Sequence, residues 1–174
     1  MSVSGMVPRN HPAQVLLRGP DDEVDDRATP LDLFRFLDGQ HHFTLDVAAS
    51  PANTKCPRYF TRDDDGLAQP WAGESVWCNP PFSGIKPWVQ KAWAEYSTTR
   101  GIVMLLPANR TEQQWWQLLV EPHRDQPGGA LSCSFLPGRI RFLRPGRTRI
   151  GPGERPPFGC LLLTWDPAGT GRSQ

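Results

Sequence analysis

The chain is organised around the stretch Val76-Trp77-Cys78-Asn79-Pro80-Pro81-Phe82. It begins as a short apolar run, which predicts a buried strand, and it ends abruptly at Asn-Pro-Pro-aromatic. The Asn79 side-chain oxygen accepts hydrogen bonds, the two prolines stiffen the turn, and Phe82 presents a flat apolar face. This combination suits gripping a planar amine between two acceptors and a ring. Because Asn-Pro and Pro-Pro are also ordinary turn dipeptides, the interpretation needs support from the rest of the chain.

Length and composition predict one domain with a substantial core. The chain has 174 residues, which is enough for a single domain of ordinary size. No apolar run reaches the length of a membrane span, and the N-terminus lacks the basic region and apolar core of a signal peptide. We therefore expect a soluble, intracellular protein with no membrane contact. We expect a flexible arm over residues 1–24, the folded domain over residues 25–166 and a flexible tail over residues 167–174.

Cysteine and histidine spacing argues against a metal site. The four cysteines are far apart and include no Cys-x-x-Cys pair; they are Cys56, Cys78, Cys133 and Cys160. Buried reduced thiols are therefore a better interpretation than zinc ligands or a disulfide framework. His41 and His42 have no spaced partners, so we interpret them as surface residues and predict no metal.

The net charge of +1 hides an asymmetry along the chain. Residues before Pro87 include 8 Lys/Arg and 12 Asp/Glu, whereas those from Pro87 onward include 11 and 6. The densest basic stretch contains Arg139, Arg141, Arg144, Arg147, Arg149 and Arg155. A solvated surface is the simplest interpretation, but arginine forks suit phosphate, so this stretch is the candidate nucleic-acid-binding segment.

Apolar periodicity predicts strands and helices in alternation. Helices are predicted from Thr29-Pro30 to Gly39, from Ser83 to Tyr96, and from a capping box at Thr111 to Glu121. Strands are predicted at residues 43–47, 58–61, 76–78, 101–107, 131–136, 139–142 (exposed) and 158–165. This order predicts an α/β fold with three layers and a mostly parallel sheet.

Asp46 lies within the apolar run at residues 43–47, where a charge is costly unless it has a partner. Either its carboxylate caps the turn that follows, or it accepts hydrogen bonds from the polar end of a cofactor. Ligands of parallel sheets bind at the carboxyl ends of strands. Because Asp46 and Asn79 both lie near such ends, we expect them to share one crevice.

Several ordered blocks resemble the phage-type DNA adenine methyltransferase (Dam-like) family, over residues 28–165. They are residues 43–53, 59–61, 65–67 with Trp71, 76–82, 88–92, 105–107 and 138–142. The resemblance implies a Rossmann-like S-adenosylmethionine-dependent methyltransferase fold. It implies S-adenosylmethionine as the methyl donor, double- or single-stranded DNA as the partner, and the cytoplasm of a bacterial host as the location. A phage or prophage origin and a link to restriction-modification are typical of the family.

The resemblance also implies roles for individual residues. Asn79, Pro80, Pro81 and Phe82 form the catalytic motif, which grips and stacks a flipped adenine. Thr29 and Pro30 lie near the methionine part of the cofactor, and Asp46 lies near its amino-acid end. Asp65 accepts a hydrogen bond from the cofactor's adenine, with Asp63 and Asp64 as alternatives. Ala48 and Ala49 replace the glycine-rich cofactor loop of the wider superfamily.

Two groups of alternatives remain open at this point. The same tetrapeptide also serves methylation of a cytosine amine, an RNA base or a protein glutamine amide; the arginines favour nucleic acid. A non-catalytic single-stranded nucleic-acid-binding protein would account for the seven tryptophans, but not for Asn79 and Asp46 together. The small size predicts weak or short sequence specificity, because only residues 123–130 and 139–157 are left to recognise sequence.

Overall fold

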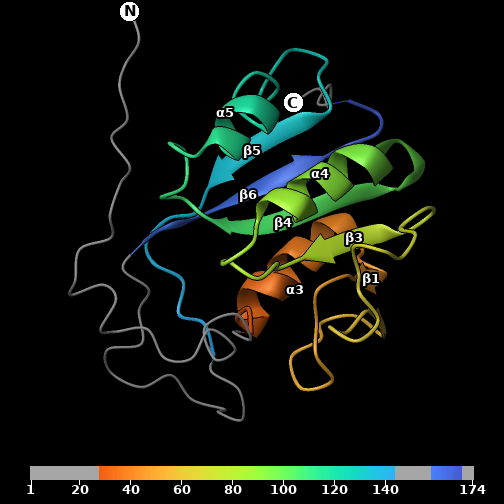
Figure 1. Cartoon of the computed structure of the whole chain (residues 1–174). Coiled ribbons are helices and arrows are strands. Elements are labelled where there is room, and N and C mark those ends of the chain that lie inside the picture. The colour runs from red at the N-terminus through yellow and green to blue at the C-terminus, as the bar shows by residue number, and fades with distance from the viewer. Residues whose placement is uncertain (1–27, 144–157, 170–174) are drawn as a thin grey trace, which may run out of the picture.

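The computed structural model of the chain describes residues 28–143 and 158–169 (Figure 1). The expected N-terminal arm, most of the expected tail and the basic loop at residues 144–157 lie outside the described residues. The elements are α3 (Leu31–His41), β1 (Leu45–Asp46), β2 (Arg58–Tyr59), β3 (Ser75–Cys78), α4 (Lys86–Glu95), a 3-10 turn η1 (Tyr96–Thr98), β4 (Gly101–Pro107), α5 (Gln114–Leu119), β5 (Leu131–Phe135) and β6 (Cys160–Trp165).

The strands form one six-stranded sheet in the order β2-β1-β3-β4-β6-β5. Strands β1 to β4 pair in parallel, whereas β6 runs antiparallel to both of its neighbours. Every residue of β4 from Ile102 to Pro107 is buried, as its continuous apolar run predicts for a central strand. The expectation of an α/β fold with a mostly parallel sheet is therefore confirmed.

Helices cover both faces of the sheet (Figure 1). Helices α4 and α5 pack on one face, where Trp88, Val89 and Trp116 join the core of the central strands. Helix α3 packs on the other face through Phe34 and Leu37. The helices and the sheet thus form three layers.

Helix α3 begins and ends differently from the prediction. Pro30, not Thr29, is its N-cap, and no side chain caps it. The helix runs through Gly39 to His41 and ends with His42 in the left-handed region at φ 52°. The reason is Asp38: its carbonyl oxygen accepts the His42 N–H, and its carboxylate accepts the Phe43 N–H at 2.8 Å. Both bonds satisfy groups at the helix end, so glycine is not needed there.

Three further local predictions are wrong. Helix α5 begins after Gln113, without the capping box at Thr111, because Gln113 is extended and ends a turn in which its N–H donates to the Arg110 carbonyl oxygen. Helix α4 has Ile85 as its N-cap, not Ser83, because Ser83 lies in the turn closed by the Gly84 N–H and the Pro81 carbonyl oxygen. Residues 139–142 form no strand, because Phe142 turns into the core on the α3 side.

A glycine brings one loop against the end of β1. A Cβ on Gly66 would lie 2.1 Å from the Val47 carbonyl oxygen, so any other residue would push the loop away. The Gly66 carbonyl oxygen also accepts the indole N–H of the buried Trp71 at 2.9 Å. This close approach holds the acidic loop around Asp65 near the carboxyl end of β1.

Three of the four thiols are buried, as the sequence predicts. Cys56, Cys78 and Cys160 are buried and unpaired, and Cys133 is half-buried and unpaired. Burial raises the pKa of the Cys56 thiol to about 12, and the nearby Asp46 carboxylate adds to that shift. These thiols stay protonated and pack as small apolar groups. Within the described ranges, no helix has the length and apolar character needed to cross a membrane.

Candidate functional site at the carboxyl edge of the sheet

A small polar hollow lies where β1 and β3 end. We call it the Asp46 hollow; its lining residues are Ala28, Thr29, Asp46, Ala48, Asn53, Lys55, Trp77 and Asn79. From β1 the chain first adds β2 on one side and then β3 on the other. The hollow therefore lies at a topological switch point, where open α/β sheets bind their ligands. The structure brings Asp46 and Asn79 together, as expected from their places at strand ends.

Asp46 is the buried anion of this hollow, with 3% of its surface exposed. Its two carboxylate oxygens accept the backbone N–H of Lys55 at 3.0 Å and, more loosely, that of Ala48 at 3.4 Å. Burial raises the pKa of Asp46 to about 6, and the two N–H bonds and the Lys55 charge limit that rise. The first of the two sequence interpretations is thus confirmed, because the carboxylate caps the following turn. The residue also lines the hollow, and its contact with a cofactor stays a prediction.

Sequence reasoning missed Lys55 and Asn53. Lys55 is half-buried, and burial lowers the pKa of its ammonium while Asp46 opposes that shift. The Asn53 side-chain oxygen accepts the Ser50 N–H at 2.7 Å, which shapes the turn after β1. Lys55 belongs to no motif, and Asn53 ends the block at residues 43–53 without a role of its own. Lys55 is, however, the first cationic residue after Asp46 in the chain, and that was the available signal.

The Thr29 hydroxyl has no hydrogen-bond partner among the described residues, although the residue is only 1% exposed. An unsatisfied buried hydroxyl is costly, so a polar atom of a ligand is its natural partner. With the Asp46 carboxylate and the Lys55 ammonium, the hollow offers an acceptor, a cation and a hydroxyl. These groups fit the amino-acid end of S-adenosylmethionine. The free volume of the hollow is about 10 Å³, room for roughly one water.

The Asn-Pro-Pro-Phe motif forms a tight turn beside the hollow. Asn79 follows the last residue of β3, and Pro80 is buried. The Pro81 carbonyl oxygen accepts the Gly84 N–H at 3.1 Å, which stiffens the turn. The Phe82 ring is half-buried and meets Phe142 and Phe158 edge-on, with ring centroids 5.8 and 6.1 Å away. Two aromatic side chains therefore fix the orientation of the ring predicted to stack on a base.

Those aromatic contacts also bring the basic segment to the motif. Arg139 and Arg141 are exposed, and the adjacent Phe142 packs against Phe82. Leu143 exchanges two backbone hydrogen bonds with Ala28, at 2.9 and 3.0 Å, and Ala28 lines the hollow. The first two arginines of the predicted nucleic-acid-binding segment thus lie on a segment fixed beside the site. Arg144, Arg147 and Arg149 lie outside the described residues.

Three predicted cofactor residues do not line the hollow. Pro30 caps α3, and the Ala49 N–H donates to the Phe60 carbonyl oxygen at 3.0 Å. Asp65 is exposed, with φ 51°, and its carboxylate accepts the Leu67 N–H at 3.2 Å in a local turn. The neighbouring Asp64 caps Thr61 in the same way. Their proximity to the cofactor therefore stays a prediction from the resemblance alone.

The fold and the hollow place this chain in the class of open α/β proteins, whose ligands bind at a switch point of the sheet. The family model described as "DNA N-6-adenine-methyltransferase (Dam)" matches residues 18–158, and the chain belongs to that family. The resemblance seen in the sequence is thus confirmed.

Two phage proteins are similar to this chain over part of its length. Both are named DNA N-6-adenine-methyltransferase. The protein of Escherichia phage T1 is 33% identical over 94 residues, which cover 53% of this chain and 40% of the relative. That of Haemophilus phage HP1 (strain HP1c1) is 30% identical over 96 residues, which cover 53% of this chain and 55% of the relative. The aligned region thus covers about half of each relative.

Proposed function

We propose that the chain transfers a methyl group from S-adenosylmethionine to the exocyclic amine of adenine in DNA, on a Rossmann-like methyltransferase fold. The observation that carries this proposal is the meeting of Asp46 and Asn79 in one hollow at the switch point of the sheet. Asp46 has the character of a cofactor anchor, and Asn79 opens an Asn-Pro-Pro-Phe turn suited to a planar amine. Membership of the Dam family supports the choice of adenine in DNA.

The residues of the Asp46 hollow hold the amino-acid end of the cofactor. The Asp46 carboxylate accepts hydrogen bonds from its ammonium, Lys55 pairs with its carboxylate, and the Thr29 hydroxyl gains the partner it lacks among the described residues. When bound, the cofactor supplies a strongly electrophilic methyl group on a sulfonium. We assign Asp65 to the adenine of the cofactor on the resemblance, supported by the close approach of Gly66 to β1.

The motif holds the target amine. The Asn79 side-chain oxygen and the Pro80 carbonyl oxygen each accept one N–H, which draws the amine toward tetrahedral geometry and orients its lone pair. The stiff turn fixes these acceptors in advance, and positioning of this kind contributes as much as ~7–11 kcal/mol to catalysis. Phe82, held by Phe142 and Phe158, contacts the face of the base.

The DNA strand lies along the basic segment. Arg139 and Arg141 are exposed beside the motif and bind phosphates near the target base. The adenine reaches the Asn-Pro-Pro-Phe motif only when it leaves the base stack, so the enzyme either flips it out of a duplex or takes it from a single strand.

The experiment is nucleoside mass spectrometry of unmethylated DNA after incubation with the protein and S-adenosylmethionine. We expect N6-methyladenine, and we expect Asn79→Ala to slow its formation by about 10²–10³-fold in single turnovers at saturating cofactor. Cofactor binding by the variant, measured by calorimetry, controls for folding.

Other products would revise the proposal in definite ways. Methylcytosine would keep the mechanism and change the base. Cofactor binding without any methylated nucleoside would point to an RNA base or a protein glutamine amide. Absence of cofactor binding would leave a non-catalytic nucleic-acid-binding protein.

A further inference from the structure

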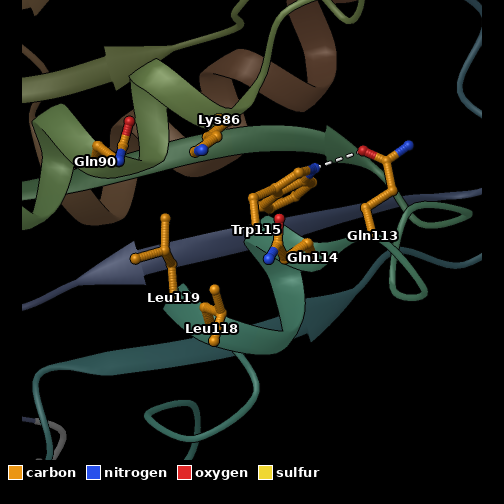
Figure 2. Close-up of a pocket in the computed structure, with 7 residues that line it drawn as sticks. All are labelled: Lys86, Gln90, Gln113, Gln114, Trp115, Leu118 and Leu119. Atoms are coloured by element: carbon orange, nitrogen blue, oxygen red, sulfur yellow. Dashed lines mark hydrogen bonds between the residues drawn. The ribbon is translucent and has the colours of Figure 1, made fainter. Parts of the chain in front are cut away.

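A second and larger depression lies between α4 and α5, with a volume of about 360 Å³. We call it the α4/α5 groove; its lining residues are Lys86, Gln90, Gln113, Gln114, Trp115, Leu118 and Leu119. Figure 2 shows Lys86 and Gln90 on α4 and the other five on α5 and its N-cap residue. Its size lies in the range of small-ligand sites. None of its lining residues is among the site residues predicted from the sequence.

The groove opens at the same edge of the sheet as the Asp46 hollow. Lys86 is the first residue of α4, seven residues after Asn79, and Gln113 is the N-cap of α5, six residues after the carboxyl end of β4. Further along the two helices, the Trp93 indole N–H donates to the Leu119 carbonyl oxygen at 2.8 Å, which joins α4 to the end of α5. A strand held at the Asn79 turn therefore has a short path to the Lys86 end of the groove.

The lining is chemically specific. It contains one cation, three glutamine amides and no carboxylate, although Asp and Glu make up 18 of the 174 residues. The Trp115 indole N–H donates to the Gln113 side-chain oxygen at 2.5 Å, which fixes that amide with its NH₂ group as the remaining donor. Lys86, Gln90 and Gln114 are exposed, and Leu118 is 60% exposed.

Such a lining matches a segment of DNA. Glutamine amides bind the hydrogen-bonding edges of bases, with adenine as their best partner, and an apolar side chain contacts a thymine methyl. A lysine without an acidic neighbour in the lining suits a phosphate. An apolar partner helix fits less well, because glutamines on both sides of the groove would lose water without gaining partners.

We propose that the α4/α5 groove holds the DNA strand next to the target adenine and reads the bases that flank it. This inference rests on the proposed function. Lys86 binds a phosphate, and Gln90 and Gln114 contact base edges. The sequence alone leaves only residues 123–130 and 139–157 to recognise the DNA sequence. The groove is a further surface that reads it.

The first test is the flanking-sequence preference of methylation on a randomised DNA library, mapped at base resolution. We expect the wild type to prefer certain bases beside the methylated adenine, and Gln90→Ala/Gln114→Ala to weaken that preference by about tenfold or more. Gln40→Ala, an exposed glutamine of α3 on the opposite face, is the matched control and keeps the wild-type preference.

Clear results would overturn this inference. A wild type without any flanking preference, or a double variant with the wild-type preference and wild-type thermal unfolding, would show that the groove does not read sequence. A wild type that makes no N6-methyladenine would instead refute the proposed function itself, so the two failures are distinguishable.

A second readout does not need catalysis. DNA carrying 5-iododeoxyuridine next to the target adenine is irradiated with the protein, and the cross-linked peptide is identified. We expect the cross-link on the peptide that contains Trp115, together with a salt dependence of DNA binding reduced by about one counterion in Lys86→Met. Arg35→Met, on the exposed side of α3, is the matched charge control. Cross-links confined to other peptides, together with an unchanged salt dependence of DNA binding in Lys86→Met, would refute the proposal. A protein partner would then be the remaining occupant of the groove.

Discussion

The Asp46 hollow and the α4/α5 groove share one edge of the sheet and are built in opposite ways. The hollow gathers buried polar groups from segments around β1 and β3, and backbone N–H groups hold its carboxylate. Four of the seven side chains that line the groove are exposed, Trp115 is buried, and one hydrogen bond, from Trp115 to Gln113, is drawn between them (Figure 2). The hollow has almost no free volume, whereas the groove has about 360 Å³.

Under the proposed function, this difference separates chemistry from selectivity. A group that anchors a cofactor must be held in one orientation, and burial with backbone hydrogen bonds achieves this at a cost in solvation. Exposed glutamines and a lysine hold no such orientation and cost little to replace. We therefore expect substitutions in the hollow to change cofactor affinity strongly, and substitutions in the groove to change which DNA is methylated.

The largest expected effect after the loss of Asn79 comes from Asp46. Asp46→Asn keeps the shape of the side chain but removes its charge, so one charge-assisted hydrogen bond of ~1.5–3 kcal/mol is lost. We expect the Kd for S-adenosylhomocysteine, measured by calorimetry, to rise by about 10–100-fold. Wild-type affinity in this variant would remove Asp46 from the cofactor site.

Asp65→Asn is the matched comparison for this measurement. Asparagine tolerates the positive φ of this position, and Asp65 is exposed, so its loss should raise the Kd only by about 2–10-fold. Asp63→Asn in the same loop should leave the Kd unchanged. If Asp63→Asn has the larger effect, the assignment of Asp65 to the adenine of the cofactor is wrong.

The raised pKa of Asp46, about 6 against 3.8 in water, makes the hollow sensitive to pH. Between these values the folded protein binds more protons than the unfolded chain, so the free energy of unfolding falls as pH rises, by up to ~3 kcal/mol from this group. Cofactor affinity should change in the opposite direction, because the ammonium of the cofactor needs the ionised carboxylate. We expect the affinity to rise by about tenfold from pH 5 to pH 7.

Calorimetry and thermal unfolding across this pH range test both slopes. Asp46→Asn should flatten both curves, whereas Asp65→Asn should keep the wild-type shape. An affinity that is independent of pH in the wild type would show that the Asp46 carboxylate does not pair with the cofactor, even if the stability curve behaves as expected.

The sequence predicted those parts of the molecule that depend on local pattern. The continuous apolar runs of β4 and β6 predicted buried strands, and Asp46 and Asn79 were predicted to meet because parallel strands end at one edge. Helix ends were less predictable. Thr29 has the residue type of an N-cap, yet its hydroxyl is buried facing the hollow, and Asp38 ends α3 where Gly39 was expected to.

The unpredicted parts depend on contacts between distant segments. Lys55 reaches the hollow because the turn after β1 folds back until the Lys55 N–H meets the Asp46 carboxylate. Polar and apolar residues alternate over residues 139–142 as in a strand, but Phe142 packs against Phe82 and the segment does not pair with a neighbouring strand. The α4/α5 groove combines Gln90 of α4 with Gln113 and Gln114 at the start of α5, and no regular spacing in the sequence predicts that they meet.

Effects of a size similar to that of Asp65→Asn separate the two regions most sharply, through a pair of lysines. Lys55→Met removes the half-buried cation of the hollow and should raise the Kd for S-adenosylhomocysteine by about 5–10-fold, while the Kd for 5′-methylthioadenosine, which lacks the amino-acid end, stays unchanged. Its DNA binding should keep the wild-type salt dependence. Lys86→Met should show the reverse pattern, with unchanged cofactor affinity and a flatter salt dependence. Only a contact with the amino-acid end distinguishes S-adenosylhomocysteine from 5′-methylthioadenosine. If Lys55→Met raises the Kd of both compounds equally, the role of Lys55 is to support the turn after β1.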